Sequence, residues 1–102
     1  MPEGPDPATA VGFAVVKSFD ALYAELAGKL AAGDPASGTV LRVEAGVHEI
    51  GKKIVEEAAE VWMAAEYQTR EQAATEISQL VYHLQVLMLA LDLTPDDIYR
   101  RL

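Results

Sequence analysis

The sequence has 102 residues, enough for one domain with a modest core, and 51% of them are hydrophobic. It contains no cysteine, which excludes disulfides and thiolate metal sites, and its formal net charge of −8 argues against nucleic-acid binding. An acidic protein can still handle a polyphosphate if metal ions lie between the two sets of negative charge.

The start of the chain and its longest apolar stretch bear on location and domain bounds. The first ten residues lack the basic and apolar regions of a signal peptide, and Leu80–Leu91 is too short an apolar stretch to cross a bilayer. We therefore expect a cytoplasmic protein without a membrane partner. Early prolines without hydrophobic periodicity predict a loosely held tail over residues 1–17 and one domain over residues 18–102.

The first half of that domain predicts one clear helix. Ser18 can cap a helix over Phe19–Ala32, where apolar residues recur at helical spacing, and Gly33 should end it. The segment Thr39–Ala45 is ambiguous. Its β-branched residues favour a strand, but no partner strand exists elsewhere, so we expect a short helical turn or an irregular segment.

The second half predicts an antiparallel helical hairpin flanked by shorter helices, so the fold class is all-α. One long helix should cover Val47–Tyr67 and a second Arg70–Leu91, with Thr69 as its cap, because so short a link makes the two helices antiparallel neighbours. A last short helix should cover Pro95–Leu102. The glutamates of the first long helix are expected opposite its apolar face. That apolar face is predicted to contain Val47, Ile50, Ile54, Ala58, Val61, Trp62 and Ala65.

The second long helix predicts an oligomer. It has almost no polar side over Leu80–Leu91 and should therefore be buried on several sides, but one chain has too few helices to surround it. We expect a homodimer whose helices form a shared bundle. His83 is most simply a buried core histidine, and Trp62 and Met63 are most simply core or interface residues.

Four glutamates are candidate metal ligands. Glu56, Glu57 and Glu60 lie within an arc of roughly 100° on the first long helix. A solvated acidic face is the ordinary explanation, but a hard cation such as Mg²⁺ turns their repulsion into chelation. Glu76 shares a face with apolar residues of the second helix and should sit level with Glu60. The carboxylates then form a hard-cation site, unless Glu76 pairs instead with Lys53 or Arg70.

Two segments resemble a known family. Residues 51–60 (Gly-Lys-Lys-Ile-Val-Glu-Glu-Ala-Ala-Glu) and 76–87 (Glu-Ile-Ser-Gln-Leu-Val-Tyr-His-Leu-Gln-Val-Leu) are similar to phosphoribosyl-ATP pyrophosphohydrolases, which are MazG-type all-α nucleotide pyrophosphohydrolases. Residues 37–39 and 93–102 agree as well, so the resemblance covers nearly the whole domain.

The resemblance implies a nucleotide-binding hydrolase of histidine biosynthesis that splits phosphoribosyl-ATP into phosphoribosyl-AMP and pyrophosphate and requires Mg²⁺. Carried onto this sequence, it makes Glu56, Glu57, Glu60 and Glu76 the metal ligands. A glutamate that is not fully engaged as a ligand can act as general base, and we expect this to be Glu57 or Glu60. Gln79 departs from the family pattern, which has Asp at this position. A neutral amide supplies no negative charge, so the site could have one fewer strong ligand.

Lys52 and Lys53 are candidates for holding substrate phosphates as point charges. Alternatively, Lys52 is a surface lysine that pairs with Glu49 or Glu56. Two other functions stay open. One is a house-cleaning enzyme that cleaves non-standard nucleoside triphosphates. The other is a non-catalytic helical dimerisation module, which stays open because Gln79 stands where the family pattern has Asp.

Overall fold

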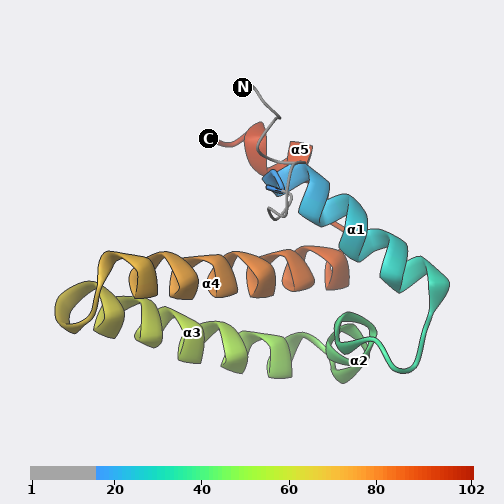
Figure 1. The fold of residues 1–102 in the computed structure, drawn as a ribbon. Coiled ribbons are helices and arrows are strands. Elements are labelled where there is room, and N and C mark those ends of the chain that lie inside the picture. Colours follow the sequence, from blue (N-terminus) through green and yellow to red (C-terminus); the bar gives the residue numbers. More distant parts are fainter. Residues whose placement is uncertain (1–15) are drawn as a thin grey trace, which may run out of the picture.

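The computed structural model describes residues 16–102, which form five α-helices and no strand (Figure 1). This confirms the all-α prediction for the described part of the chain, whereas nearly all of the predicted tail over residues 1–17 lies outside it. None of the five helices is both long enough and apolar enough to cross a membrane. The helices are α1 (Phe19–Ala32), α2 (Gly38–Ala45), α3 (Val47–Tyr67), α4 (Arg70–Ala90) and α5 (Pro95–Tyr99).

Residues at the helix ends set these bounds. The Ser18 hydroxyl accepts a hydrogen bond from the Ala21 N–H at 3.0 Å, and Gly33 ends α1 with φ = 67°, a left-handed conformation that glycine adopts without strain. At the start of α4, the Thr69 hydroxyl accepts from the Gln72 N–H and the Gln72 side chain accepts from the Thr69 N–H, each at 3.1 Å. The predicted first helix and the cap at Thr69 are confirmed.

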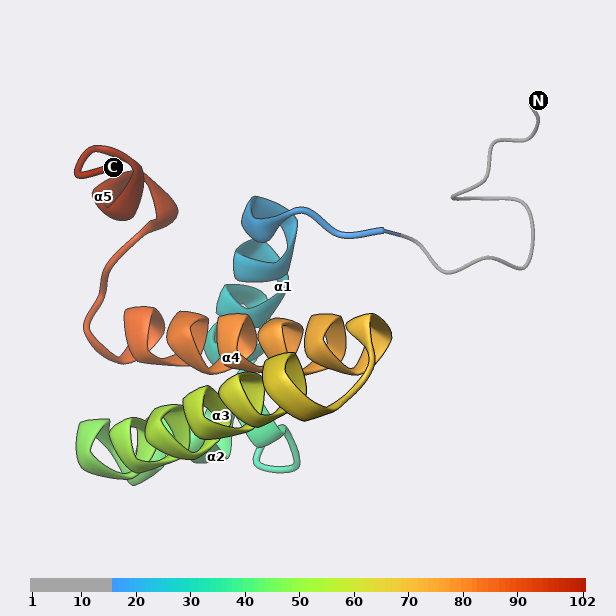
Figure 2. The same ribbon diagram turned by 90° about the vertical axis from the view of Figure 1, so that its left-hand side faces the viewer.

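The helices α3 and α4 lie side by side as an antiparallel hairpin (Figures 1 and 2). The buried residues of α3 are Ile50, Glu57 and Ala64, which recur every seven positions and so stay on the side of α3 that faces α4. The predicted apolar face is therefore wrong in part, because one glutamate belongs to the buried stripe. Four of its predicted members are exposed, namely Val47, Ala58, Trp62 and Ala65.

The helices α1 and α2 pack against α4. From α4, the Gln85 side-chain amide donates to the backbone carbonyl of Phe19 at 2.9 Å, and the Tyr82 hydroxyl shares a 2.9 Å hydrogen bond with the buried Thr39 of α2. The ambiguous segment is thus a helix of eight residues, capped by Ser37. Its packing on the hairpin, rather than its local sequence, decides its conformation.

The chain ends beside the start of α1 (Figure 1). The Tyr99 hydroxyl donates to Asp20 at 2.6 Å, and the Tyr23 hydroxyl donates to the Leu93 carbonyl at 2.8 Å. The helix α5 ends at Tyr99, before the predicted Leu102. The backbone N–H groups of Arg101 and Leu102 donate to carbonyls three residues earlier instead of four. This is the hydrogen-bond pattern of a 3₁₀ turn, so the α-helix does not continue.

Candidate metal centre and adjoining cleft

Three glutamates converge where the two long helices face each other. Glu57 and Glu60 of α3 and Glu76 of α4 each offer one carboxylate oxygen, and these oxygens lie within 4.8 Å of one another. The link between the helices consists of only Gln68 and Thr69, which fixes the register and brings Glu60 and Glu76 level. The predicted pairing of Glu60 with Glu76 across the hairpin is confirmed, and Glu57 joins them.

These three residues form the carboxylate cluster, and their surroundings differ. Glu57 is buried, with 6% of its surface exposed, Glu76 is partly buried, and Glu60 is exposed. Loss of hydration raises the pKa of Glu76, and the neighbouring carboxylates of Glu60 and Glu57 raise it further. The cluster is therefore a concentration of negative charge that is open to solvent on one side.

Lys53 is the basic side chain that reaches the cluster. Its Nζ lies 3.5 Å from Glu57 Oε2 and 3.5 Å from Glu56 Oε1. The exposed Glu56 is not brought into the cluster, since neighbouring residues of a helix point about 100° apart. Within residues 16–102, neither Lys53 nor Arg70 pairs with Glu76, so the alternative of an ion pair for Glu76 finds no support.

The remaining predicted residues lie at the edges of this region. Lys52 Nζ lies 3.5 Å from Glu49 Oε1, which is the surface pairing that the sequence left open. Gln79 is exposed, one helical turn after Glu76, and its side chain forms no hydrogen bond with any described residue. It is therefore free to turn toward the cluster or toward water.

The donor set of the cluster suits a hard divalent cation. Mg²⁺ binds oxygen at about 2.0–2.1 Å, so its ligand oxygens lie about 3–4 Å apart, depending on whether they are adjacent or opposed. The oxygens of Glu57, Glu60 and Glu76 lie within 4.8 Å of one another, which is close to this range. Lys53 alone does not balance three carboxylates. The residues present thus fit such an ion both in donor type and in charge.

A cleft of about 520 Å³ adjoins the cluster, between α2, α3 and α4. Arg42, Lys52 and Lys53 contribute positive charge to its lining, while Ile50 and Val86 contribute apolar surface. Arg42 was missed by the sequence analysis because its segment had no firm structural assignment. The sequence does contain one indication of a role for Arg42, because this residue lies one helical turn after Gly38 and Thr39, within the region that resembles the family.

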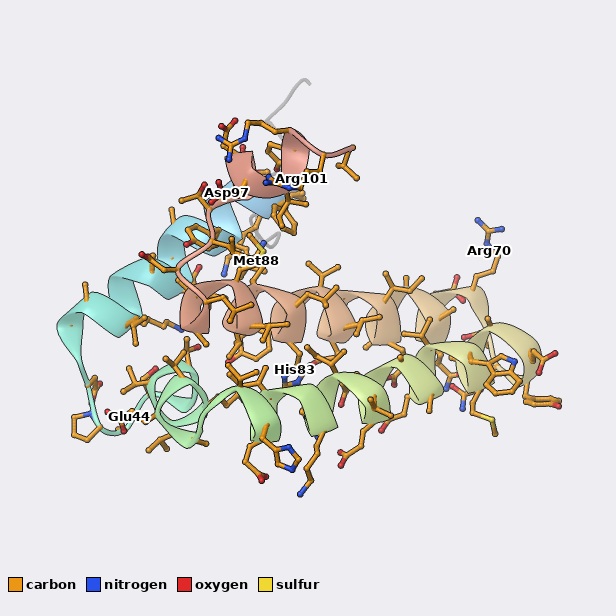
Figure 3. The ribbon with its side chains drawn as sticks, turned by 180° about the vertical axis from the view of Figure 1, so that it is seen from behind. Glu44, Arg70, His83, Met88, Asp97 and Arg101 are labelled. Atoms are coloured by element: carbon orange, nitrogen blue, oxygen red, sulfur yellow. The ribbon has the colours of Figure 1, made fainter. Side chains whose placement is uncertain are left out.

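His83 is the buried ring on the α4 side of this cleft. Figure 3 shows its side chain between α4 and α3, and its ring meets Tyr82 edge-on at a centroid distance of 4.9 Å. Burial lowers the pKa of His83, and the nearby charge of Arg42 lowers it further. The prediction of a buried histidine is confirmed, and the ring forms part of the cleft wall.

An all-α hairpin that carries a carboxylate cluster beside a partly cationic cleft defines a class of helical protein whose carboxylates are candidate ligands for a hard cation. The family model described as phosphoribosyl-ATP pyrophosphohydrolase matches residues 20–102. The chain belongs to this family. The match includes every residue of the cluster and of the cleft lining named above.

Individual relatives agree with the family match. The chain is 58% identical over 87 residues to a protein of Salinibacter ruber named phosphoribosyl-ATP pyrophosphatase, with 85% of this chain and 100% of the relative covered. It is 59% identical over 87 residues to a Streptomyces coelicolor protein of the same name, with 84% of this chain and 97% of the relative covered. The similarity therefore extends over nearly the full length of both relatives.

Proposed function

We propose that this protein hydrolyses phosphoribosyl-ATP to phosphoribosyl-AMP and pyrophosphate, as a step of histidine biosynthesis, and that it does so with Mg²⁺. Family membership over residues 20–102 and the names of two close, full-length relatives support the substrate. The observation that carries the chemistry is the convergence of Glu57, Glu60 and Glu76 to within 4.8 Å.

The chain's own residues have distinct tasks in this proposal. Glu57, Glu60 and Glu76 hold the ion, with Glu56 as a fourth ligand if its exposed side chain turns inward. When bound, Mg²⁺ neutralises charge on the phosphate oxygens and lowers the pKa of the attacking water. Glu57 is fixed by burial and by Lys53, whereas Glu60 faces solvent. Either of these two can accept the proton of the attacking water as general base.

The basic residues position the phosphates. Lys53 lies between the cluster and the cleft and can contact a phosphate group without leaving Glu57. Lys52 lines the same cleft, and an incoming phosphate has only to compete with its exposed pairing to Glu49. Both lysines act as flexible point charges in this role.

The proposal includes a homodimer, as the sequence suggested. Ile77 and Leu84 of α4 and Leu91, the residue that follows the helix, recur every seven positions and are 49%, 40% and 49% exposed. Val55 and Trp62 show the same spacing on α3. Exposed apolar stripes on both helices of a hairpin are typical of a surface that a partner covers. A second copy of the hairpin would complete a four-helix bundle.

The test is pyrophosphate release from phosphoribosyl-ATP, measured with Mg²⁺ and with a chelator. Release should require the metal and should fall by about a hundredfold or more in Glu57→Ala, because both a ligand and a candidate base are lost. Glu66→Ala, an exposed glutamate on the same helix, is the matched control. Absence of release from the wild type under any condition would overturn the proposal, and a panel of non-standard nucleoside triphosphates would then test the house-cleaning alternative.

A further inference from the structure

The cleft extends away from the carboxylate cluster in one direction. Its lining on α3 ends at Glu56, just before the first glutamate of the cluster, and its lining on α4 begins at His83, seven residues beyond Glu76. Seven helical residues rise about 10 Å. Because α3 and α4 are antiparallel, the residues before Glu57 on α3 and those after Glu76 on α4 both lie on the side of the cluster that faces α2. A ligand with one end at the cluster can therefore lie along the cleft with its other end at α2.

The positive charges along this path are not equivalent. Lys52 pairs with Glu49, and Lys53 pairs with Glu56 and Glu57. Arg42, in the last turn of α2, forms no ion pair with any residue of the described range 16–102. Its side chain is exposed to the cleft, and its planar fork of N–H donors matches the oxygens of a phosphate.

The proposed substrate has phosphates at both ends. The triphosphate is the part that is cleaved, and a separate 5′-phosphate belongs to the phosphoribosyl group on the base, which ordinary ATP lacks. With the triphosphate at the carboxylate cluster, the base and its second ribose would run past Ile50, His83 and Val86 toward α2. The far phosphate would then lie on the α2 side of the cleft, whose lining includes Arg42.

We propose that Arg42 binds the 5′-phosphate of the base-linked phosphoribosyl group and thereby distinguishes phosphoribosyl-ATP from ATP. This inference rests on the proposed function and adds to it a specificity residue remote from the carboxylates. Lys53 contacts Glu57 of the cluster, and Lys52 precedes it on α3, so these two lysines serve the triphosphate, which both nucleotides share.

The test compares Arg42→Gln with Arg42→Lys and with Arg70→Gln. Arg70 is the matched control, because it lies at the start of α4 and points away from the hairpin at the end opposite to α2 (Figure 3). In Arg42→Gln the KM for phosphoribosyl-ATP should rise by about ten- to a hundredfold, more than kcat falls, since hydrogen bonds to a charged group are lost. The KM should rise less in Arg42→Lys, and the KM of Arg70→Gln should match that of the wild type. Circular dichroism confirms that each variant is folded.

Two inhibitors separate this role from general phosphate binding. Ribose 5-phosphate should compete with substrate in the wild type and compete at least tenfold more weakly in Arg42→Gln. ATP, which lacks the far phosphate, should inhibit both proteins with similar constants. An active wild type together with an unchanged KM in Arg42→Gln would overturn the inference and leave the proposed function standing. Equal weakening of ATP and phosphoribosyl-ATP would also overturn it, since Arg42 would then contact a shared phosphate. A wild type that releases no pyrophosphate would overturn the proposed function and this inference together.

Discussion

Replacing Glu57 with glutamine is expected to remove about half or more of the stabilisation that Mg²⁺ gives to the fold. The substitution keeps the size of a buried side chain and removes one of three charges that lie within 4.8 Å. A ligand that binds only the folded chain stabilises it by RT ln(1 + [L]/Kd), which is about 2.7 kcal/mol at one hundred times Kd. In a domain of this size each kcal/mol moves the unfolding midpoint by about 4–8 °C, so the wild type should gain about 10–20 °C.

The variant should gain half of that or less. Residues that merely orient a metal ligand change affinity by about 10–100-fold, and losing a charged ligand costs at least as much. At the same Mg²⁺ concentration the stabilisation then falls to about 0.4–1.4 kcal/mol. Thermal unfolding followed by circular dichroism, first in chelator and then along a Mg²⁺ titration, measures both proteins. Glu66→Gln on the same helix should behave as the wild type. An equal gain in Glu57→Gln, or an equal loss in Glu66→Gln, would refute the assignment of the cluster as the metal site.

Three further predictions concern pH, assembly and the core. The pKa of Glu76 is raised in the folded state, so its ionisation costs stability. The metal-free protein should lose stability as the pH rises from about 4.5 through the folded-state pKa, and Glu76→Gln should flatten that part of the curve. Thermal unfolding in chelator at a series of pH values checks this, and parallel curves would contradict it. If the proposed dimer forms through the exposed apolar stripe of α4, Leu84→Glu places a charge in that interface, so light scattering should show a dimer for the wild type and a monomer for the variant. A variant that stays dimeric would exclude this face. Leu26→Ala should lower the free energy of unfolding by about 2–5 kcal/mol in denaturant titrations, because Leu26 is buried in the packing of α1. A loss below about 1 kcal/mol would show that the packing of α1 contributes little to stability.

The helices α1 and α4 could be predicted closely because their ends carry strong local signals. Ser18 and Gly33 bound α1, and Thr69 caps α4, so the capping geometry agrees with the apolar periodicity. The helix α2 has only eight residues and contains β-branched side chains, so local preference does not determine it. Its conformation depends on packing against α3 and α4, which a single sequence does not reveal.

The candidate site was predictable in composition more than in arrangement. The pairing of Glu60 with Glu76 follows from counting residues on either side of a short link, and the structure bears this out. The burial of Glu57 does not follow from helical periodicity, which places apolar residues inside and glutamates outside. A carboxylate turned inward breaks that rule, and such exceptions are expected where function opposes stability. Arg42 could not be placed without first knowing that its segment is a helix.

Because the link between α3 and α4 has only two residues, the site depends on the number of residues between Glu60 and Glu76 more than on their identity. Adding or deleting a single residue in either helix between Glu60 and Glu76 turns one carboxylate by about 100° relative to the other and separates them. The connection from Gly33 to Ser37 carries no such constraint, because α1 bears no member of the cluster. Insertions and deletions that preserve catalysis should therefore accumulate before α2, while the hairpin keeps a fixed number of residues.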